Sequence, residues 1–324
     1  MKKKVSLIIP SFNDNNKLTK LLSSLKTWQV IPNEIIIVDS SQNKFSISKD
    51  FKRFVKKFSI RLLLIHKKNL FPGHSRNIGI INSKNSLLAF LDTSTLPNAN
   101  WLSSGLKIIK KNDSEGVWGN TYYQSDKNIS KIIRACTVGE KPIKTLPGTI
   151  LKKEVFNRCG LFIENVRAGE DGDLRSRVEL HKINMYDPKE TLVYNKLNFI
   201  SLKELLKKWF RNYTFTSKLP FSRAHKDFYY YGISIFFVLI AFNWNNVVAS
   251  WNENSDFYIP HITKITILTI FISYILFRGV LLPKLKGTSY KFLFPINFIF
   301  IVLLSAFLDF VKVAAYIYSR FKND

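Results

Sequence analysis

The sequence predicts an α/β fold with a mostly parallel, Rossmann-like sheet flanked by helices, followed by an α-helical membrane region of about three spans. Two observations predict this architecture. From residue 1 to about 200, short β-branched runs alternate with amphipathic stretches, which is typical of βαβ units. After residue 227 the composition changes to apolar segments long enough to cross a bilayer.

The expected elements of the first part follow in chain order. The strand candidates are apolar and rich in β-branched residues, and they lie at 5–10, 34–40, 60–66 and 86–93. A helix is expected over 16–28, because its leucines recur at helical spacing, with Asn13 or Asn15 as its N-cap. This arrangement predicts a first catalytic or binding domain over residues 1–200.

The second part begins with a basic, aromatic segment at 201–227, whose composition predicts an interfacial helix or linker. Three apolar segments follow, at about 228–250, 262–283 and 292–318, within the membrane region 228–324. In the third segment Asp309 and Lys312 share a helix face and can neutralise each other.

Charge places these segments relative to the membrane. The loop at 252–261 is acidic, whereas the loop at 283–291 and the stretch before the first span are basic. By the positive-inside bias, the N-terminal domain faces the cytoplasm. The N-terminal apolar run ends at Pro10, which is too early for the apolar core of a signal peptide.

The formal net charge of +26 over 324 residues favours a polyanionic neighbour, which leaves nucleic acid, anionic lipid and a phosphorylated small molecule open. Nucleic acid ranks last, because the basic residues concentrate beside the first span and no recognition motif is present. Only Cys136 and Cys159 are cysteines, which argues against a disulfide framework and a cysteine-based zinc site.

Polar clusters follow three of the expected strands: "SFNDNN" from Ser11, "DSSQNK" from Asp39 and "DTST" from Asp92. In open α/β sheets ligands bind beyond the carboxyl ends of the strands, so the clusters predict one shared pocket. Turn chemistry is the alternative for each cluster alone. No G-x-G-x-x-G, P-loop, H-E-x-x-H or G-x-S-x-G motif is present, which disfavours dinucleotide, P-loop, zinc-protease and hydrolase functions.

Six sequence blocks, taken together, indicate a function more specifically than any single polar cluster does. They are "SLIIPSFND", "IIIVDSS", "GHSRNIGI", "LLAFLDTSTLPNANWL", "PGTILKKEVFNRCGLF" and "GEDGDLRSRV". In this order and spacing they resemble the inverting family-2 glycosyltransferases of the GT-A fold, over about the first 200 residues. By this resemblance Asp39 contacts the nucleotide base, Asp92 contacts the ribose or the donor sugar, and Arg76 approaches the donor. The donor-binding residues it implies are Pro10, Ser11, Asn13, Asp39, Arg76, Asp92 and Ser94.

The resemblance also implies the catalytic group. Asp171 matches the general base that acts on the acceptor hydroxyl, with Glu170 beside it, although an acidic first helical turn is the alternative for both. Gly148 and Thr149 would lie on the acceptor side. Arg175 and Arg177 are candidates to stabilise the leaving diphosphate, unless they belong to a solvated helix face.

Two departures concern the metal ion that the family uses. The family's D-x-D motif would place a second acid at Ser94, and a histidine of the family that faces the metal is replaced by Asn195. Three alternatives remain open. Mg²⁺ or Mn²⁺ can still bind through Asp92, Asn195 and the donor phosphates, arginine or lysine can replace the metal, or catalysis has been lost.

The membrane half of the sequence limits the class of acceptor molecule. The Q-x-x-R-W motif of processive synthases is not found, so we predict transfer of single sugars from a nucleoside-diphosphate sugar to a lipid-linked glycan or glycolipid. The alternatives are transfer to polyprenyl phosphate itself and a non-catalytic subunit that binds sugar nucleotides. The richness in Lys, Asn and Ile favours a bacterial genome, and hence a multi-pass protein of the bacterial inner membrane.

Overall fold

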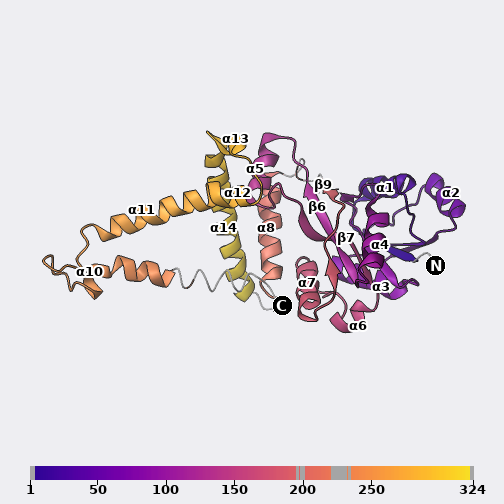
Figure 1. Cartoon of the computed structure of the whole chain (residues 1–324), viewed down its shortest axis with the longest axis horizontal. Helices are drawn as coiled ribbons and strands as arrows, with labels where there is room; N and C mark the ends of the chain where they lie inside the picture. Colours follow the sequence, from indigo (N-terminus) through magenta and orange to yellow (C-terminus); the bar gives the residue numbers. More distant parts are fainter. Residues whose placement is uncertain (1–3, 195–196, 198–200, 220–231, 233–234, 322–324) are drawn as a thin grey trace.

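The structure is a computed structural model that describes residues 4–194, 197, 201–219, 232 and 235–321. A sheet domain stands at one end and an extended helical region at the other (Figure 1). The sheet has nine strands in the order β3-β2-β1-β4-β7-β6-β9-β5, with β8 paired to β6. The α/β architecture predicted from the sequence is confirmed.

The first four strands are parallel and lie close to their predicted positions: β1 (Val5–Ser11), β2 (Glu34–Asp39), β3 (Arg61–His66) and β4 (Leu87–Phe90). The helices that connect them are α1 (Asn15–Ser24, continued by the 3₁₀ turn η1, Leu25–Thr27), α2 (Lys49–Lys57) and α3 (Pro72–Asn82). The predicted caps of α1 were wrong. Asp14 is the N-cap residue and makes no side-chain cap bond, while Asn13 has a φ of 52°.

The second half of the sheet is mixed in direction, because β7 pairs antiparallel with both β4 and β6. The sheet is therefore less parallel than predicted. Its elements are β5 (Thr95–Leu96), α4 (Trp101–Lys111), β6 (Gly116–Tyr123), α5 (Asn128–Cys136), β7 (Ile143–Lys152), α6 (Val155–Cys159), α7 (Glu170–Leu180), β8 (Met185–Tyr186) and β9 (Leu192–Tyr194).

The core lies on both faces of this sheet. Along β1, Leu7 and Ile9 pack with the leucines of α1, whereas Ile8 packs on the opposite face with α3 and α7 residues. This alternation follows from the two-residue period of a strand. Because both faces are covered by helices, ligands reach the sheet only at its edges.

The helical region contains α8 (Leu202–Thr216), α10 (Trp244–Val247), α11 (Ile262–Ile275), the π-helical η3 (Leu276–Leu281), α12 (Leu282–Leu285), α13 (Tyr290–Leu293) and α14 (Asn297–Phe321). A capping box between Ser201 and Glu204 begins α8. Among the described residues, two helices are long and apolar enough to cross a membrane, Ile262–Leu285 and Asn297–Phe321. The first predicted span, 228–250, falls partly outside the described residues, and its residues 235–242 are helical.

Candidate functional site

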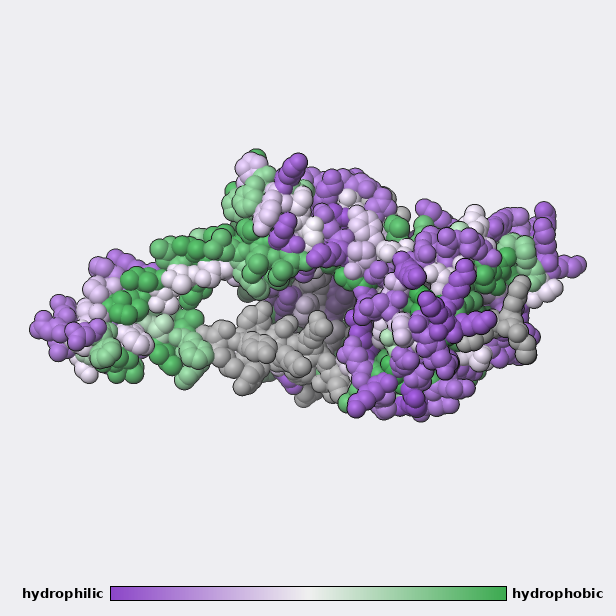
Figure 2. Space-filling model, in the orientation of Figure 1, coloured by the Kyte–Doolittle hydropathy of each residue, from purple (hydrophilic) through white to green (hydrophobic). Residues whose placement is uncertain are grey.

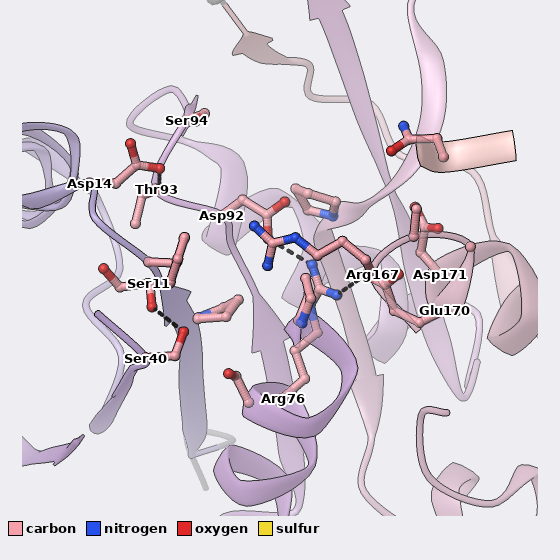
Figure 3. A pocket seen from close by; sticks show the side chains of 18 of the residues that line it. Ser11, Asp14, Ser40, Arg76, Asp92, Thr93, Ser94, Arg167, Glu170 and Asp171 are labelled. Carbon is pink, nitrogen blue, oxygen red and sulfur yellow. Dashed lines mark hydrogen bonds and ion pairs between the residues drawn. The ribbon is translucent and has the colours of Figure 1, made fainter. Parts of the chain in front are cut away.

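A cavity of about 740 Å³ lies where the carboxyl ends of β1 and β4 meet the first turn of α7 and one face of α8 (Figure 3). Its size suits a nucleotide sugar or a similar ligand. Its polar lining residues are Ser11, Asp14, Ser40, Ser75, Arg76, Asp92, Thr93, Ser94, Tyr123, Arg167, Glu170, Asp171, Tyr194, Lys208, Arg211, Asn212 and Thr216.

Arg76 joins two acids at the base of this cavity. Its Nη1 donates to Glu170 Oε1 at 2.7 Å, and its Nη2 donates to Asp92 Oδ1 at 2.9 Å. Burial alone would lower the pKa of Arg76, but the charges of Asp92 and Glu170 raise it above its ordinary value. Burial raises the pKa of Glu170, and Arg76 opposes that effect. The network ties β4, α3 and α7 together.

Asp171 is exposed, and its Oδ1 accepts a hydrogen bond from the Gly172 amide at 2.8 Å. Figure 3 shows its side chain near Arg167 and Glu170, at the α7 end of the cavity. Tyr123 and Tyr194 lie on the sheet side, with ring centroids 4.9 Å apart. Burial, together with the charges of Asp171 and Asp92, raises the pKa of Tyr123 to about 12. Its hydroxyl therefore stays protonated and can donate a hydrogen bond to a ligand.

The turn before Glu170 depends on Gly169, which has a φ of 98°. A Cβ there would lie 2.6 Å from Leu219 Cδ1 and 2.7 Å from Thr216 Cγ2, so only glycine lets α7 approach the end of α8.

We expect Gly169→Ala to destabilise the fold by about 1–3 kcal/mol, because it combines backbone strain with this overlap. Gly172→Ala is the matched control. It lies in the same helix with nothing within 4 Å of its added Cβ, and it should stabilise the helix by about 0.5–1 kcal/mol. Thermal unfolding of both variants in detergent measures the difference. Equal melting temperatures would contradict the proposed contact.

Three cations that the sequence analysis did not assign to the site line the cavity: Arg167, Lys208 and Arg211. The Arg167 guanidinium lies 5.1 Å from the ring centroid of Phe12, which follows β1. Burial and the nearby Arg167 charge lower the pKa of Arg211. Arg167 and Arg211 thus repel each other, and an anion bound between them relieves that repulsion.

The structure brings together Pro10, Ser11, Arg76, Asp92, Ser94, Glu170 and Asp171 of the predicted residues around the cavity. Two predicted donor-binding residues do not line it. Asp39 is fully buried, and its carboxylate accepts hydrogen bonds from the Ser41 hydroxyl at 2.6 Å and from the Phe45 amide at 2.7 Å. The backbone N–H of Asn13 donates to the Ser41 hydroxyl at 2.7 Å. Both therefore organise the loop after β2, where Ser40 lines the cavity instead.

The predicted acceptor-side and leaving-group residues also lie elsewhere. Thr149 is buried and holds the Gly119 amide at 2.9 Å, while the carbonyl of Gly148 accepts from Trp101. Arg175 donates to the Lys144 carbonyl at 2.6 Å, and Arg177 pairs with Asp173 at 2.6 Å. Thr149, Arg175 and Arg177 therefore make contacts within the fold and do not line the cavity.

The described residues alone do not supply a complete protein donor set for a divalent ion. They contain no group of three or more His, Cys, Asp or Glu side chains able to hold a metal. Asp92 is engaged by Arg76, while Asp14 is engaged by Lys17 and Thr93. Ser94 contributes a weakly coordinating hydroxyl, and Asn195 lies outside the described residues.

Comparisons with known proteins agree with this fold. A family model described as "Glycosyl transferase family 2" matches residues 6–163. A Rickettsia bellii protein described as "Uncharacterized glycosyltransferase" is 32% identical over 178 residues, which are 52% of this chain and 25% of that protein. Glycosyltransferase AglE of Haloferax volcanii is 31% identical over 164 residues, 49% of this chain and 52% of that protein. The chain thus spans a quarter to about half of these relatives.

Among solved structures, the mannosyltransferase PcManGT from Pyrobaculum calidifontis in complex with GDP-Man and Mn²⁺ is similar, with a TM-score of 0.53 and 12% sequence identity. The match covers 99% of this chain and 88% of that one. At this identity the likeness concerns the fold, which is a GT-A-like sheet domain followed by helices.

Proposed function

We propose that the protein, whose residues 6–163 match the model of glycosyl transferase family 2, is a membrane-anchored transferase of single sugars. It moves the sugar, with inversion, from a nucleoside diphosphate to a lipid-linked glycan or glycolipid. The observation that carries the proposal is one cavity in which a carboxylate, Asp171, shares the wall with three cations.

Asp171 is the base of this reaction. An inverting transfer needs a carboxylate that accepts the acceptor's proton on the side of the sugar opposite the leaving group. Asp171 is exposed and its second carboxylate oxygen is available to an acceptor hydroxyl. Glu170 is a positioning residue, because its carboxylate is buried against Arg76.

Arg167, Lys208 and Arg211 hold the diphosphate. As the glycosidic bond breaks, negative charge develops on the leaving phosphate, and cations fixed around it stabilise the transition state. A guanidinium is suited to this task, since its parallel N–H groups match two phosphate oxygens. Tyr123, with its protonated hydroxyl, adds a neutral hydrogen-bond donor on the sheet side of the cavity.

The acceptor reaches the cavity from the membrane. The Lys208, Arg211 and Thr216 side of α8 lines the cavity, while Phe210 packs against Tyr318 of α14 with ring centroids 5.5 Å apart. One helix therefore separates the cavity from the apolar helices. Figure 2 shows the projecting arm that contains α11 as a mainly hydrophobic surface, in contrast to the hydrophilic sheet domain.

Binding of nucleoside diphosphates to the full chain in detergent tests the role of the cations. We expect Arg211→Ala to weaken binding by about 10- to 100-fold, as loss of a charge-assisted hydrogen bond does. Binding by the native protein should be equally tight in EDTA and in Mg²⁺. Isothermal titration calorimetry measures both effects.

Arg53→Ala is the matched control, because Arg53 is exposed on α2, outside the cavity. Its affinity should equal that of the native protein. If a nucleoside diphosphate binds only with Mg²⁺, the assignment of the cations is wrong while sugar transfer stands. If none binds under either condition, the proposed function is wrong.

A further inference from the structure

The two apolar helices differ in their surroundings. α14 packs along its length against the sheet domain and α8. At its start, Asn128 of α5 donates to Asn297 at 3.2 Å, and near its end Ser217 and Ser319 are 2.7 Å apart. Between these contacts Ile132 and Ile133 of α5 share a core cluster with α14 residues. One face of α14 is therefore covered by protein from end to end.

α11 has no buried side chain. Among the described residues, Tyr274 of α11 and Arg278 and Gly279 of the following η3 contact α14 where the helices cross. A Cβ on Gly279 would lie 2.6 Å from Val302, and Tyr274 donates to Asp309 at 3.0 Å. From this crossing α11 runs away from α14 and α8 toward α10 (Figure 1).

The helical residues 235–242 extend in the same direction as α11 (Figure 1). The far end of this arm is tied together by Asn245, whose side chain donates to the Ile259 carbonyl at 2.8 Å and accepts from the Ile259 amide at 2.9 Å. Residues 235–251, which belong to an uncharged stretch of the sequence, and the helix Ile262–Leu285 thus form a hairpin that projects from the rest of the molecule.

The hairpin and α14 cannot both span the bilayer. If α14 crossed the bilayer, α8 would enter it as well, along with Lys203, Lys207 and Arg211, whose transfer to hydrocarbon is costly. The face of α14 that points away from the protein is a stripe of exposed apolar side chains spaced three, four or seven residues apart: Phe300, Leu303, Phe307, Phe310, Ile317 and Phe321. Such a stripe suits a helix that lies in the plane of the interface.

The charges at the crossing agree with that placement. Arg278 binds both carboxylate oxygens of Asp309 at 2.9 Å, and Lys312 lies 3.2 Å from Asp309. Arg278 is seven residues before Leu285, the end of the helix, which is about 10 Å along its axis. With the hairpin across the bilayer, the cluster lies away from the bilayer centre, toward one interface. With α14 across it, Asp309 would lie near the middle of the hydrocarbon.

We propose that only the hairpin crosses the bilayer, and that α14 lies on the membrane surface with its apolar stripe among the acyl chains of the leaflet that faces the catalytic domain. The third predicted span, 292–318, is then an in-plane helix. Both termini lie on one side of the membrane, in line with the basic residues Arg320 and Lys322 near the C-terminus. The inference rests on the membrane association proposed above.

Cysteine accessibility tests the topology in the full chain. Cys136 and Cys159 are replaced by alanine, and single cysteines are placed at Lys56 in the catalytic domain, at Asn254 in the hairpin loop and at Asp324. Each variant is labelled with an impermeant maleimide in vesicles of both orientations. We expect Lys56→Cys and Asp324→Cys to label from the same side and Asn254→Cys from the other.

Labelling of positions 254 and 324 from one side and 56 from the other would overturn the proposal, since it requires α14 to cross. Labelling of all three from one side would overturn the hairpin. Sugar transfer by the same variants is measured separately, so that a wrong topology and a wrong function are distinguishable.

Depth measurements provide an independent test. Nitroxide labels are attached at Phe300→Cys, Phe310→Cys and Phe321→Cys in vesicles of phosphatidylethanolamine and phosphatidylglycerol. We expect the three labels to lie at the same shallow depth by electron paramagnetic resonance accessibility. A label at 310 near the bilayer centre, with shallow labels at 300 and 321, would contradict an in-plane helix.

Discussion

Asp171→Asn is expected to lower turnover by about 10² to 10⁴, because asparagine cannot accept the proton of the acceptor hydroxyl. The fold should be retained. Asp171 is exposed, and an asparagine Oδ1 can still accept the 2.8 Å hydrogen bond from the Gly172 amide. Binding of the nucleoside diphosphate should be unchanged, since the cations that hold it are intact. Single-turnover transfer to a lipid-linked acceptor measures the chemical step.

Glu179→Gln makes the same chemical change at an exposed position of the same helix, outside the cavity, and should leave turnover unaltered. A folded Asp171→Asn variant with native turnover would remove the base assignment. That result would favour an acceptor whose nucleophile is already ionised, such as a lipid phosphate, and the product would then carry one sugar on that phosphate.

Arg76→Met is expected to have the largest effect on stability, about 3–5 kcal/mol. The substitution keeps an unbranched side chain but removes the cation that Glu170 and Asp92 share, and Glu170 is almost fully buried. Chemical or thermal unfolding of the detergent-solubilised chain measures the loss. The stability of Arg76→Lys should lie between those of the native protein and Arg76→Met. Its ammonium keeps the positive charge but cannot reproduce the two divergent N–H groups of the guanidinium.

The exposed Arg53→Ala variant sets the baseline for loss of one positive charge, and its unfolding should be native-like. If Arg76→Met were as stable as Arg53→Ala, the two acids would not depend on Arg76. The same experiment at lower pH has a predictable direction. Burial raises the pKa of Glu170, so acidification neutralises this group more readily in the folded state and should lessen the destabilisation of Arg76→Met.

The strands and the acids of the site could be predicted from the sequence because both follow local patterns. β-branched runs predicted β1 to β4, and the residues that follow strand ends, such as Asp92, lie where parallel strands place them. Asp39 obeys the same rule, yet its side chain turns into the loop and is satisfied by Ser41 and Phe45. Strand position does not reveal which way a side chain at its end will turn.

The cations of the cavity could not be predicted, because they depend on contacts between distant segments. Lys208 and Arg211 lie in a basic helix whose composition also suits a lipid surface, and only packing decides which face of α8 meets the cavity. Arg167 precedes the acidic turn but is not part of a motif. Hydropathy has a similar limit for α14, since it does not distinguish a helix that crosses a bilayer from one that packs beside a domain on its surface.

The cavity wall is built from two successive parts of the chain. The family match ends at residue 163, while Arg167, Glu170, Asp171 and the α8 cations all follow it. The matched part thus supplies Ser11, Arg76 and Asp92 to the cavity, and the later residues supply the proposed base and the cations. A chain cut at residue 200 would therefore keep Arg167 and Asp171 but lose the side of the cavity that Lys208 and Arg211 line.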